Sequence, residues 1–160
     1  MFWGQHHREY GRVHEYFFRK PKELRDKYDW FMVCRNPYDY MISNYYQYCK
    51  WKGLTATNDP KHLNEIIQAQ IQQPNAFGGF FSHQHKFLDA TSKIDVLRFE
   101  SLEEDFDDLM KRYGIDAKLE HHNKTENKQL SRTDLFPETI RFIQTIFHDD
   151  FQTFGYLKEF

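Results

Sequence analysis

Long apolar runs are missing from the sequence. Nowhere do about 18 apolar residues follow one another, so no segment has the composition of a membrane-spanning helix. Cysteine is scarce as well: Cys34 and Cys49 are too few for a disulfide framework and are not at the spacing of a metal site. Cys34 lies within an apolar segment and is predicted to be a buried thiol. These absences together predict a cytoplasmic protein.

An excess of positive charge is also missing. Lys and Arg number 22 against 24 Asp and Glu, for a net charge of -2. A general nucleic-acid binder needs a basic face that displaces counterions, so that class is excluded as the expected function. What the sequence does contain is aromatic residues, 18% of the chain within a hydrophobic fraction of 39%. Phe and Tyr are therefore expected to build much of the core of one domain over residues 1–160.

Short apolar strands and amphipathic helices alternate along the chain, which is typical of an α/β layer fold with parallel strands. Two strands are clear, at residues 29–34 and 94–99, because each is a short apolar run with sharp ends. After the second strand, Ser101 and Glu104 predict a capping box at the start of a helix, and Gly114 predicts its end. Helices are predicted at residues 5–18, 21–28, 37–51, 60–72, 83–90, 101–114 and 137–147.

The first strand ends in Arg35-Asn36-Pro37, and a helix is predicted to begin at once. Asn36 is a good N-cap residue, and Pro37 suits the first helical position. Asp39 is expected to reach back to the cap and to complement the helix dipole. In open α/β sheets ligands bind where strands end, and a helix N-terminus there attracts anions. The planar guanidinium of Arg35 matches phosphate oxygens, so this junction predicts a phosphate site.

Ser43 lies on nearly the same side of this helix as Asn36, because the two are about two turns apart. Arg35 and Ser43 are therefore candidates to hold one phosphate together. The spacing is equally consistent with a structural role in a scaffold domain. In that alternative Arg35 pairs with an acidic side chain at the strand end, and Ser43 only fills a helix position. Binding of a nucleotide distinguishes these interpretations.

Four stretches of the chain have a recognisable pattern. "RNPYDYMISNYY" resembles the 3′-phosphate-binding motif of sulfotransferases that use 3′-phosphoadenosine 5′-phosphosulfate, whose pattern is roughly R-N-P-x-D-R-x-x-S-x-Y. "DVLRFESLEEDF", "HHNKT" and "HDDFQTFGY" resemble, in this order, three segments of the carbohydrate branch of that family. The first motif is fairly specific, and the other three gain weight because they follow in register. The resemblance spans about residues 7–156.

The resemblance implies a three-layer α/β fold in which a small parallel sheet is flanked by helices, similar to P-loop kinases. It implies an enzyme that moves a sulfuryl group from 3′-phosphoadenosine 5′-phosphosulfate to a hydroxyl or amine of a carbohydrate, without a metal. Arg35 and Ser43 then bind the 3′-phosphate, in agreement with the reading of the junction. Lys124 and Arg132, in the downstream loop, are candidates for contacts with a phosphate or the adenosine. The alternative for both is a solvated loop.

The chain departs from the family pattern in two places. Tyr40 stands where the family has a second arginine, which either weakens the phosphate site or alters helix packing. Ahead of Arg35 there is also no loop of the K-x-G-x-T-S type, which holds the 5′-phosphosulfate and supplies a lysine. The fold is therefore predicted to be N-terminally truncated, and a non-catalytic or partner-completed nucleotide-binding domain is the alternative function. A sheet without its first strand has an open edge, which predicts a homodimer, strand exchange or marginal stability.

Sulfuryl transfer needs a base that takes the proton of the acceptor, and a histidine or a carboxylate can serve. The resemblance places a histidine on the segment before the first strand. His7 matches that place best, His6 nearly as well, and Glu9 is a rival. The alternative for each histidine is a surface or capping role. His7 and His14 share a helical face, but no acidic or thiolate group completes a zinc site, so no metal is predicted.

Overall fold

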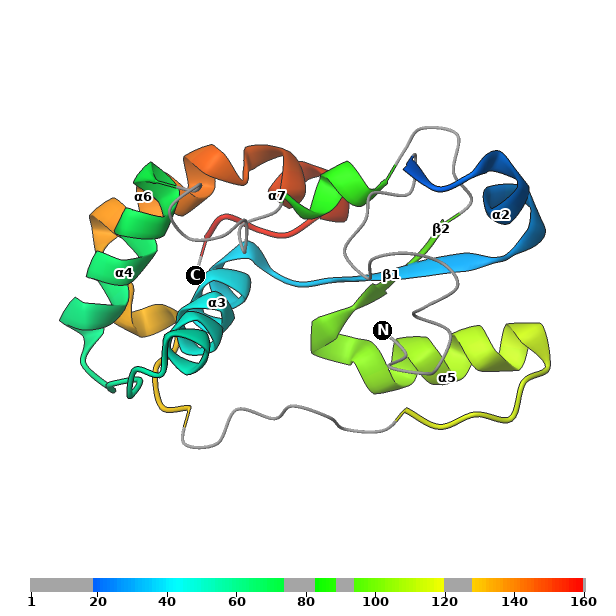
Figure 1. The fold of residues 1–160 in the computed structure, drawn as a ribbon, viewed down its shortest axis with the longest axis horizontal. Coiled ribbons are helices and arrows are strands. Elements are labelled where there is room, and N and C mark those ends of the chain that lie inside the picture. The colour runs from blue at the N-terminus through cyan, green and yellow to red at the C-terminus, as the bar shows by residue number, and fades with distance from the viewer. Residues whose placement is uncertain (1–18, 74–82, 89–93, 120–127, 160) are drawn as a thin grey trace. The chain divides into compact units, whose positions relative to one another are not determined.

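The computed structural model describes residues 19–73, 83–88, 94–119 and 128–159. The predicted site residues His7 and Lys124 lie outside these ranges, as does the helix predicted at 5–18. The chain divides into two compact units (Figure 1). The first unit comprises Met1–Cys34 and His83–Leu119, and the second comprises Arg35–Ser82 and Glu120–Phe160.

A sheet of two parallel strands forms the base of the first unit. The strands are β1 (Trp30–Cys34) and β2 (Ile94–Arg98), close to their predicted bounds. The register pairs Trp30 with Ile94 at one end, and Cys34 is 1% exposed, as predicted. The other elements of this unit are α2 (Lys22–Lys27), η3 (Gln84–Phe87), η4 (Phe99–Ser101) and α5 (Leu102–Tyr113).

Helix α5 packs its apolar face against the sheet. The ring of Phe106 is 1% exposed and meets Phe31 of β1 edge-on, with 6.4 Å between the ring centroids. The helix ends at Gly114 with a φ of 64°, a left-handed conformation that glycine adopts without steric cost. The predicted capping box of Ser101 and Glu104 is wrong, because the hydroxyl of Ser101 instead donates to Asp105 at 3.1 Å.

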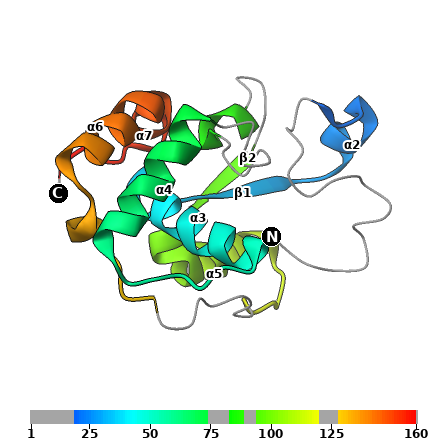
Figure 2. The ribbon, with the colours of Figure 1, turned by 60° about the vertical axis from the view of Figure 1, so that its left-hand side comes forward.

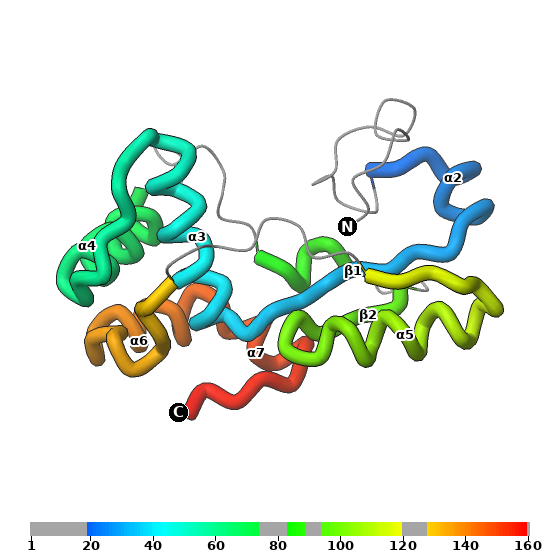
Figure 3. The backbone as a smooth tube through the Cα atoms, turned by 90° about the horizontal axis from the view of Figure 1, so that it is seen from below, coloured from blue at the N-terminus to red at the C-terminus, as the bar shows by residue number. Residues whose placement is uncertain are grey.

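The second unit is all helical within the described residues. Helices α3, α4 and α6 pack against one another, and α7 follows directly on α6 (Figures 2 and 3). Aromatic residues contribute much of their core alongside Ile, Leu and Met, in line with the composition, and Tyr38, Tyr45 and Phe147 are fully buried. The elements are α3 (Pro37–Lys52), α4 (Pro60–Gln72), η5 (Arg132–Asp134), α6 (Pro137–Ile146) and α7 (His148–Phe154).

The alternation of strands and helices and the parallel pairing confirm the α/β class. The proline-led starts of α3, α4 and α6 were all predicted, because a proline at the first helical position loses no hydrogen bond. Helix α7 was not predicted, and the helix expected at 83–90 is the short 3₁₀ turn η3. Three layers like those of P-loop kinases and a single domain remain predictions. Within the described ranges every helix is too short or too polar to cross a membrane.

Candidate functional site

The first turn of α3 is the structural base of the candidate site. Asn36 is the N-cap, as predicted: its side-chain oxygen accepts a hydrogen bond of 3.0 Å from the backbone N–H of Tyr38. Pro37 occupies the first helical position, and Asn36 is only 5% exposed. The helix dipole favours a negative charge at this end of α3.

Asp39 is not part of a capping box, so that prediction is wrong. Its carboxylate instead accepts two hydrogen bonds from Arg132, one from Nε to Oδ1 at 3.1 Å and one from Nη2 to Oδ2 at 2.5 Å. A two-point pair of this kind fixes the plane of the guanidinium. The side chains of Arg132 and Asp39 are 34% and 24% exposed, so solvent screens their attraction only in part.

The electrostatics around Asp39 reveal two further cations. Burial acts to raise the pKa of Asp39, but the hydrogen bond and the charge of Arg132 outweigh that effect. The charges of Arg35 and Lys128 act in the same direction as Arg132, so the pKa of Asp39 lies below its ordinary value. Asp39 is therefore an ionised carboxylate at neutral pH, surrounded by three cationic side chains.

The pKa of Lys128 lies below its ordinary value as well. Partial burial of its ammonium lowers the pKa of Lys128 first, and repulsion by Arg35 lowers it further. Asp39 offsets part of this repulsion. We refer to Arg35, Lys128 and Arg132 with Asp39 as the cation cluster. Three cationic side chains act on one carboxylate here, and such a group of cations suits a phosphate dianion.

Ser43 lies on the face of α3 that bears the cation cluster. It follows Asp39 by one helical turn, and Tyr46 follows it by about one more, so the three share a face. Asp39 binds Arg132, and the hydroxyl of Tyr46 accepts N–H groups of the same downstream segment. Ser43 is half-buried between these two contact points along the helix. The helix therefore holds it beside the segment that supplies Lys128 and Arg132.

The C-terminal end of the described chain anchors the start of α3. Tyr38 is fully buried, and its hydroxyl donates a hydrogen bond of 2.6 Å to the backbone oxygen of Lys158. The side-chain amide of Gln144 donates to the same two oxygens, at 2.7 and 2.9 Å. The ring of Phe151 packs edge-on against Tyr38, with 5.1 Å between centroids. Contacts from α6 and α7 therefore hold the first turn of α3, which contains Asp39, in place.

The described structure brings together three of the five residues predicted for the site. Arg35 and Arg132 both act on Asp39, and Ser43 lies one turn along the same helix. His7 and Lys124 remain predictions. Lys128 was missed. It belongs to the same polar loop as Lys124 and lies four residues before Arg132, but its position near Arg35 depends on the tertiary fold.

Tyr40, at the position where the family motif has a second arginine, is half-buried and packs against the hydrophobic core of the second unit. Its ring meets Phe147 edge-on, with 5.9 Å between centroids. A residue that packs in this way brings no charge to the site. This position therefore contributes to helix packing, which was one of the two outcomes predicted for the departure.

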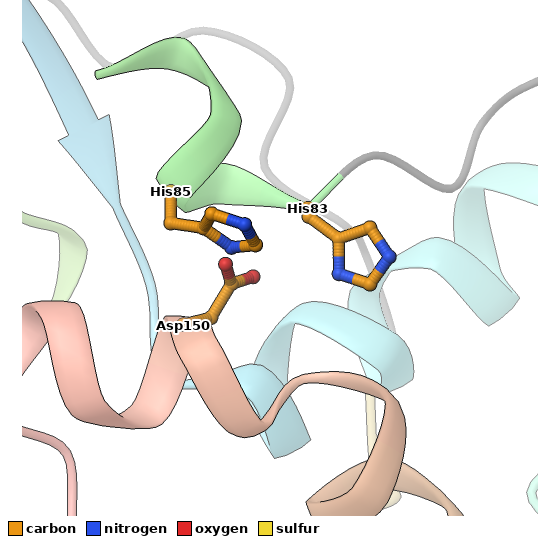
Figure 4. Close-up of side chains that lie close together, drawn as sticks. All are labelled: His83, His85 and Asp150. Atoms are coloured by element: carbon orange, nitrogen blue, oxygen red, sulfur yellow. The ribbon is translucent and has the colours of Figure 1, made fainter. Parts of the chain in front are cut away.

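Two histidines in the first unit lie close together at the start of η3. The rings of His83 and His85 are tilted against each other with 5.5 Å between centroids (Figure 4). Both side chains are half-buried. Figure 4 also draws Asp150, a fully buried residue of α7 that belongs to the second unit. The imidazole pair offers two nitrogen ligands, fewer than a structural zinc site uses.

Comparison with known protein families gives one match. The family model described as the sulfotransferase domain matches residues 20–115, more than half of the chain. The matched region includes β1, the Arg35 junction, α3, β2 and α5. No curated protein and no solved structure matches the chain significantly.

Proposed function

The chain belongs to the sulfotransferase family, and on that premise we propose that it uses 3′-phosphoadenosine 5′-phosphosulfate to sulfate a carbohydrate hydroxyl or amine. The observation that supports this proposal is the cation cluster at the capped start of α3. Arginine and lysine side chains grouped in this way suit a phosphate on the ribose of a nucleotide.

The proposed roles follow the chemistry of each side chain. Arg35 offers a planar pair of donors to the 3′-phosphate, and the Ser43 hydroxyl donates a further hydrogen bond. Arg132 is held in one orientation by Asp39, so it adds positive charge at a fixed place. Lys128 adds an ammonium group near Arg35. Lys124 is proposed to contact the same nucleotide from the loop before Lys128.

The transfer itself breaks the bond between sulfur and the bridging oxygen of the donor. A bond from the acceptor oxygen or nitrogen to sulfur forms, and adenosine 3′,5′-bisphosphate leaves. The acceptor proton passes to a base, for which His7 is proposed. Negative charge builds up on the leaving oxygen, as in phosphoryl transfer, and fixed donors aimed at that charge accelerate such reactions.

The carbohydrate acceptor is proposed from the order of the three downstream segments, which resemble the carbohydrate branch of the family. "DVLRFESLEEDF" forms β2 and the start of α5, and "HDDFQTFGY" forms α7 and its end. These segments pack as structural elements of the fold. The identity of the sugar is open to a direct assay with a panel of acceptors.

The test is isothermal calorimetry with adenosine 3′,5′-bisphosphate, combined with a transfer assay that uses labelled donor and a panel of glycans. We expect the wild type to bind the bisphosphate and Arg35→Ala to bind it at least about tenfold more weakly. Arg141→Ala is the matched control, because Arg141 is an exposed arginine on α6 of the same unit. Binding without transfer indicates the non-catalytic alternative, and no binding by the wild type overturns the proposal.

A further inference from the structure

The segment that supplies the cations of the downstream loop is fastened to α3 and α4 along its length. We call residues 128–136 the docked segment; it precedes α6 and is drawn in gold in Figure 2. Side chains of the two helices bind its backbone at both ends, at Tyr46 and at Asn64. Asp39 binds Arg132 between these two points.

Tyr46 fastens the N-terminal end of the docked segment. Its hydroxyl oxygen accepts the backbone N–H groups of Gln129 and Leu130, at 3.3 and 3.2 Å. The same hydroxyl donates to the side-chain oxygen of Asn58 at 3.4 Å. Tyr46 is 6% exposed, so these bonds are shielded from water. Lys128 directly precedes Gln129, and its backbone position therefore depends on this hydroxyl.

Asn64 fastens the C-terminal end. The side chain is 1% exposed and uses both of its polar atoms. Its nitrogen donates to the backbone oxygens of Pro60 and Asp134, at 2.7 and 2.8 Å, and its oxygen accepts the N–H of Phe136 at 2.8 Å. No charged or apolar side chain of this size can replace both the donor and the acceptor.

The docked segment is also stiff between its two ends. Ser131 and Asp134 form a reciprocal capping box around the 3₁₀ turn η5. Leu130 and Leu135 are 4% and 5% exposed and belong to the core of the second unit. A segment with this many internal and external bonds transmits a displacement at either end to the residues between them.

We propose that Tyr46 and Asn64 are positioning residues of the nucleotide site. They hold the docked segment on α3 and α4, so that Lys128 and Arg132 stay beside Arg35, and in this way they determine the affinity for the nucleotide phosphate without touching it. This inference rests on the proposed function.

The docked segment has to be fastened because the cations of the cation cluster repel one another. Lys128 and Arg35 repel each other, and this repulsion adds to burial in lowering the pKa of Lys128. Anchors made of neutral hydrogen bonds hold the cations together without reducing the charge that attracts the phosphate. Sites prepared in this way lose less energy to ordering when the ligand binds.

The test compares Tyr46→Phe with Tyr45→Phe by calorimetry with adenosine 3′,5′-bisphosphate. The two tyrosines are adjacent in α3 and both are buried, but the Tyr45 hydroxyl bonds to Thr57 and His62 instead of the docked segment. Both variants keep the ring and are expected to lower the melting temperature to a similar extent. We expect Tyr46→Phe to raise the Kd about three- to tenfold, and Tyr45→Phe to leave it unchanged.

A second arm tests whether Tyr46 acts through Lys128. In the Lys128→Ala background the effect of Tyr46→Phe on the Kd should shrink to less than about twofold, because the displaced cation is already absent. Asn64→Asp, which keeps the shape but loses the donor, should raise the Kd like Tyr46→Phe. This inference alone is overturned if wild type, Tyr46→Phe and Asn64→Asp have equal Kd values while Arg35→Ala still binds the bisphosphate more weakly. A wild type that does not bind the bisphosphate overturns the proposed function as well.

Discussion

Asp39 and Arg132, separated by 93 positions in the sequence, form a two-point ion pair that joins the start of α3 to the loop before α6. The pair orients one guanidinium and compensates one positive charge. Arg35 and Lys128 act on the same carboxylate through their charges, so three cationic side chains gather around Asp39. The hydrogen-bond donors that an anion would need at the start of α3 are therefore already in place.

Loss of the Asp39 carboxylate should destabilise the second unit. In Asp39→Asn the guanidinium of Arg132 keeps its burial but loses its charged partner. We expect the free energy of unfolding to fall by about 1–2 kcal/mol, less than for a fully buried pair because solvent screens part of the attraction. Urea unfolding at neutral pH measures this. Asp95→Asn is the control, since it breaks the more exposed pair of Asp95 with Arg112 and should cost clearly less.

The contribution of Asp39 should depend on pH with a defined sign. Its pKa in the folded protein lies below the ordinary aspartate value of about 3.9, so the unfolded chain takes up the proton first. The stabilisation is complete above about pH 4 and is lost as the pH falls through the folded-state pKa. The stability difference between wild type and Asp39→Asn should therefore narrow in acid. A difference that is constant from neutral pH to about pH 2 would contradict this.

Sequence patterns identified the local features of this region because local physics controls them. Asn36 before Pro37 predicts the start of α3, and Pro60 predicts the start of α4, since capping and the missing proline N–H act within one turn. The paired strands were recognisable from their short apolar runs. The motif that contains Arg35 and Ser43 predicts a phosphate site at the start of α3, and these residues do lie at that junction and on that helix.

The partners of these residues could not be predicted in the same way. The pair of Asp39 with Arg132 forms only when α3 and the loop before α6 meet, and no local signal distinguishes it from a capping box. Lys128 was overlooked for the same reason, because its role depends on its distance from Arg35. Helix α7 was missed because its N-cap, Phe147, makes no side-chain hydrogen bond that a sequence pattern would reveal.

Binding of the bisphosphate should be accompanied by proton uptake at alkaline pH. The pKa of Lys128 is lowered in the free protein, first by partial burial and then by Arg35. A phosphate dianion favours the charged ammonium and raises that pKa again. Calorimetry at about pH 9–10 in two buffers with different ionisation enthalpies measures the uptake. Lys128→Arg, whose guanidinium stays charged at this pH, should bind the bisphosphate without proton uptake. Equal proton uptake by the wild type and by Lys128→Arg would exclude Lys128 as the source of the effect.

Ser43 should contribute to affinity but not to stability. Ser43→Ala removes one hydroxyl from the half-buried face of α3 and should raise the Kd for the bisphosphate by about three- to tenfold. Its melting temperature should stay near that of the wild type, because alanine is the better helix former. Thr145→Ala on α6 is the control, since the Thr145 hydroxyl bonds only within its own helix. A Kd that is unchanged in Ser43→Ala would remove Ser43 from the site.

The measurement that tests the central claim most directly is calorimetric titration of wild type, Arg35→Lys and Arg35→Ala with adenosine 3′,5′-bisphosphate at several salt concentrations. The account predicts that Arg35→Ala binds about ten- to a hundredfold more weakly and with a shallower dependence on salt, because one charged contact with the phosphate is lost. Arg35→Lys should lie between the two, since it keeps the charge but not the planar pair of donors. Equal affinities and equal salt dependence for all three proteins would contradict the assignment of a nucleotide phosphate to the start of α3.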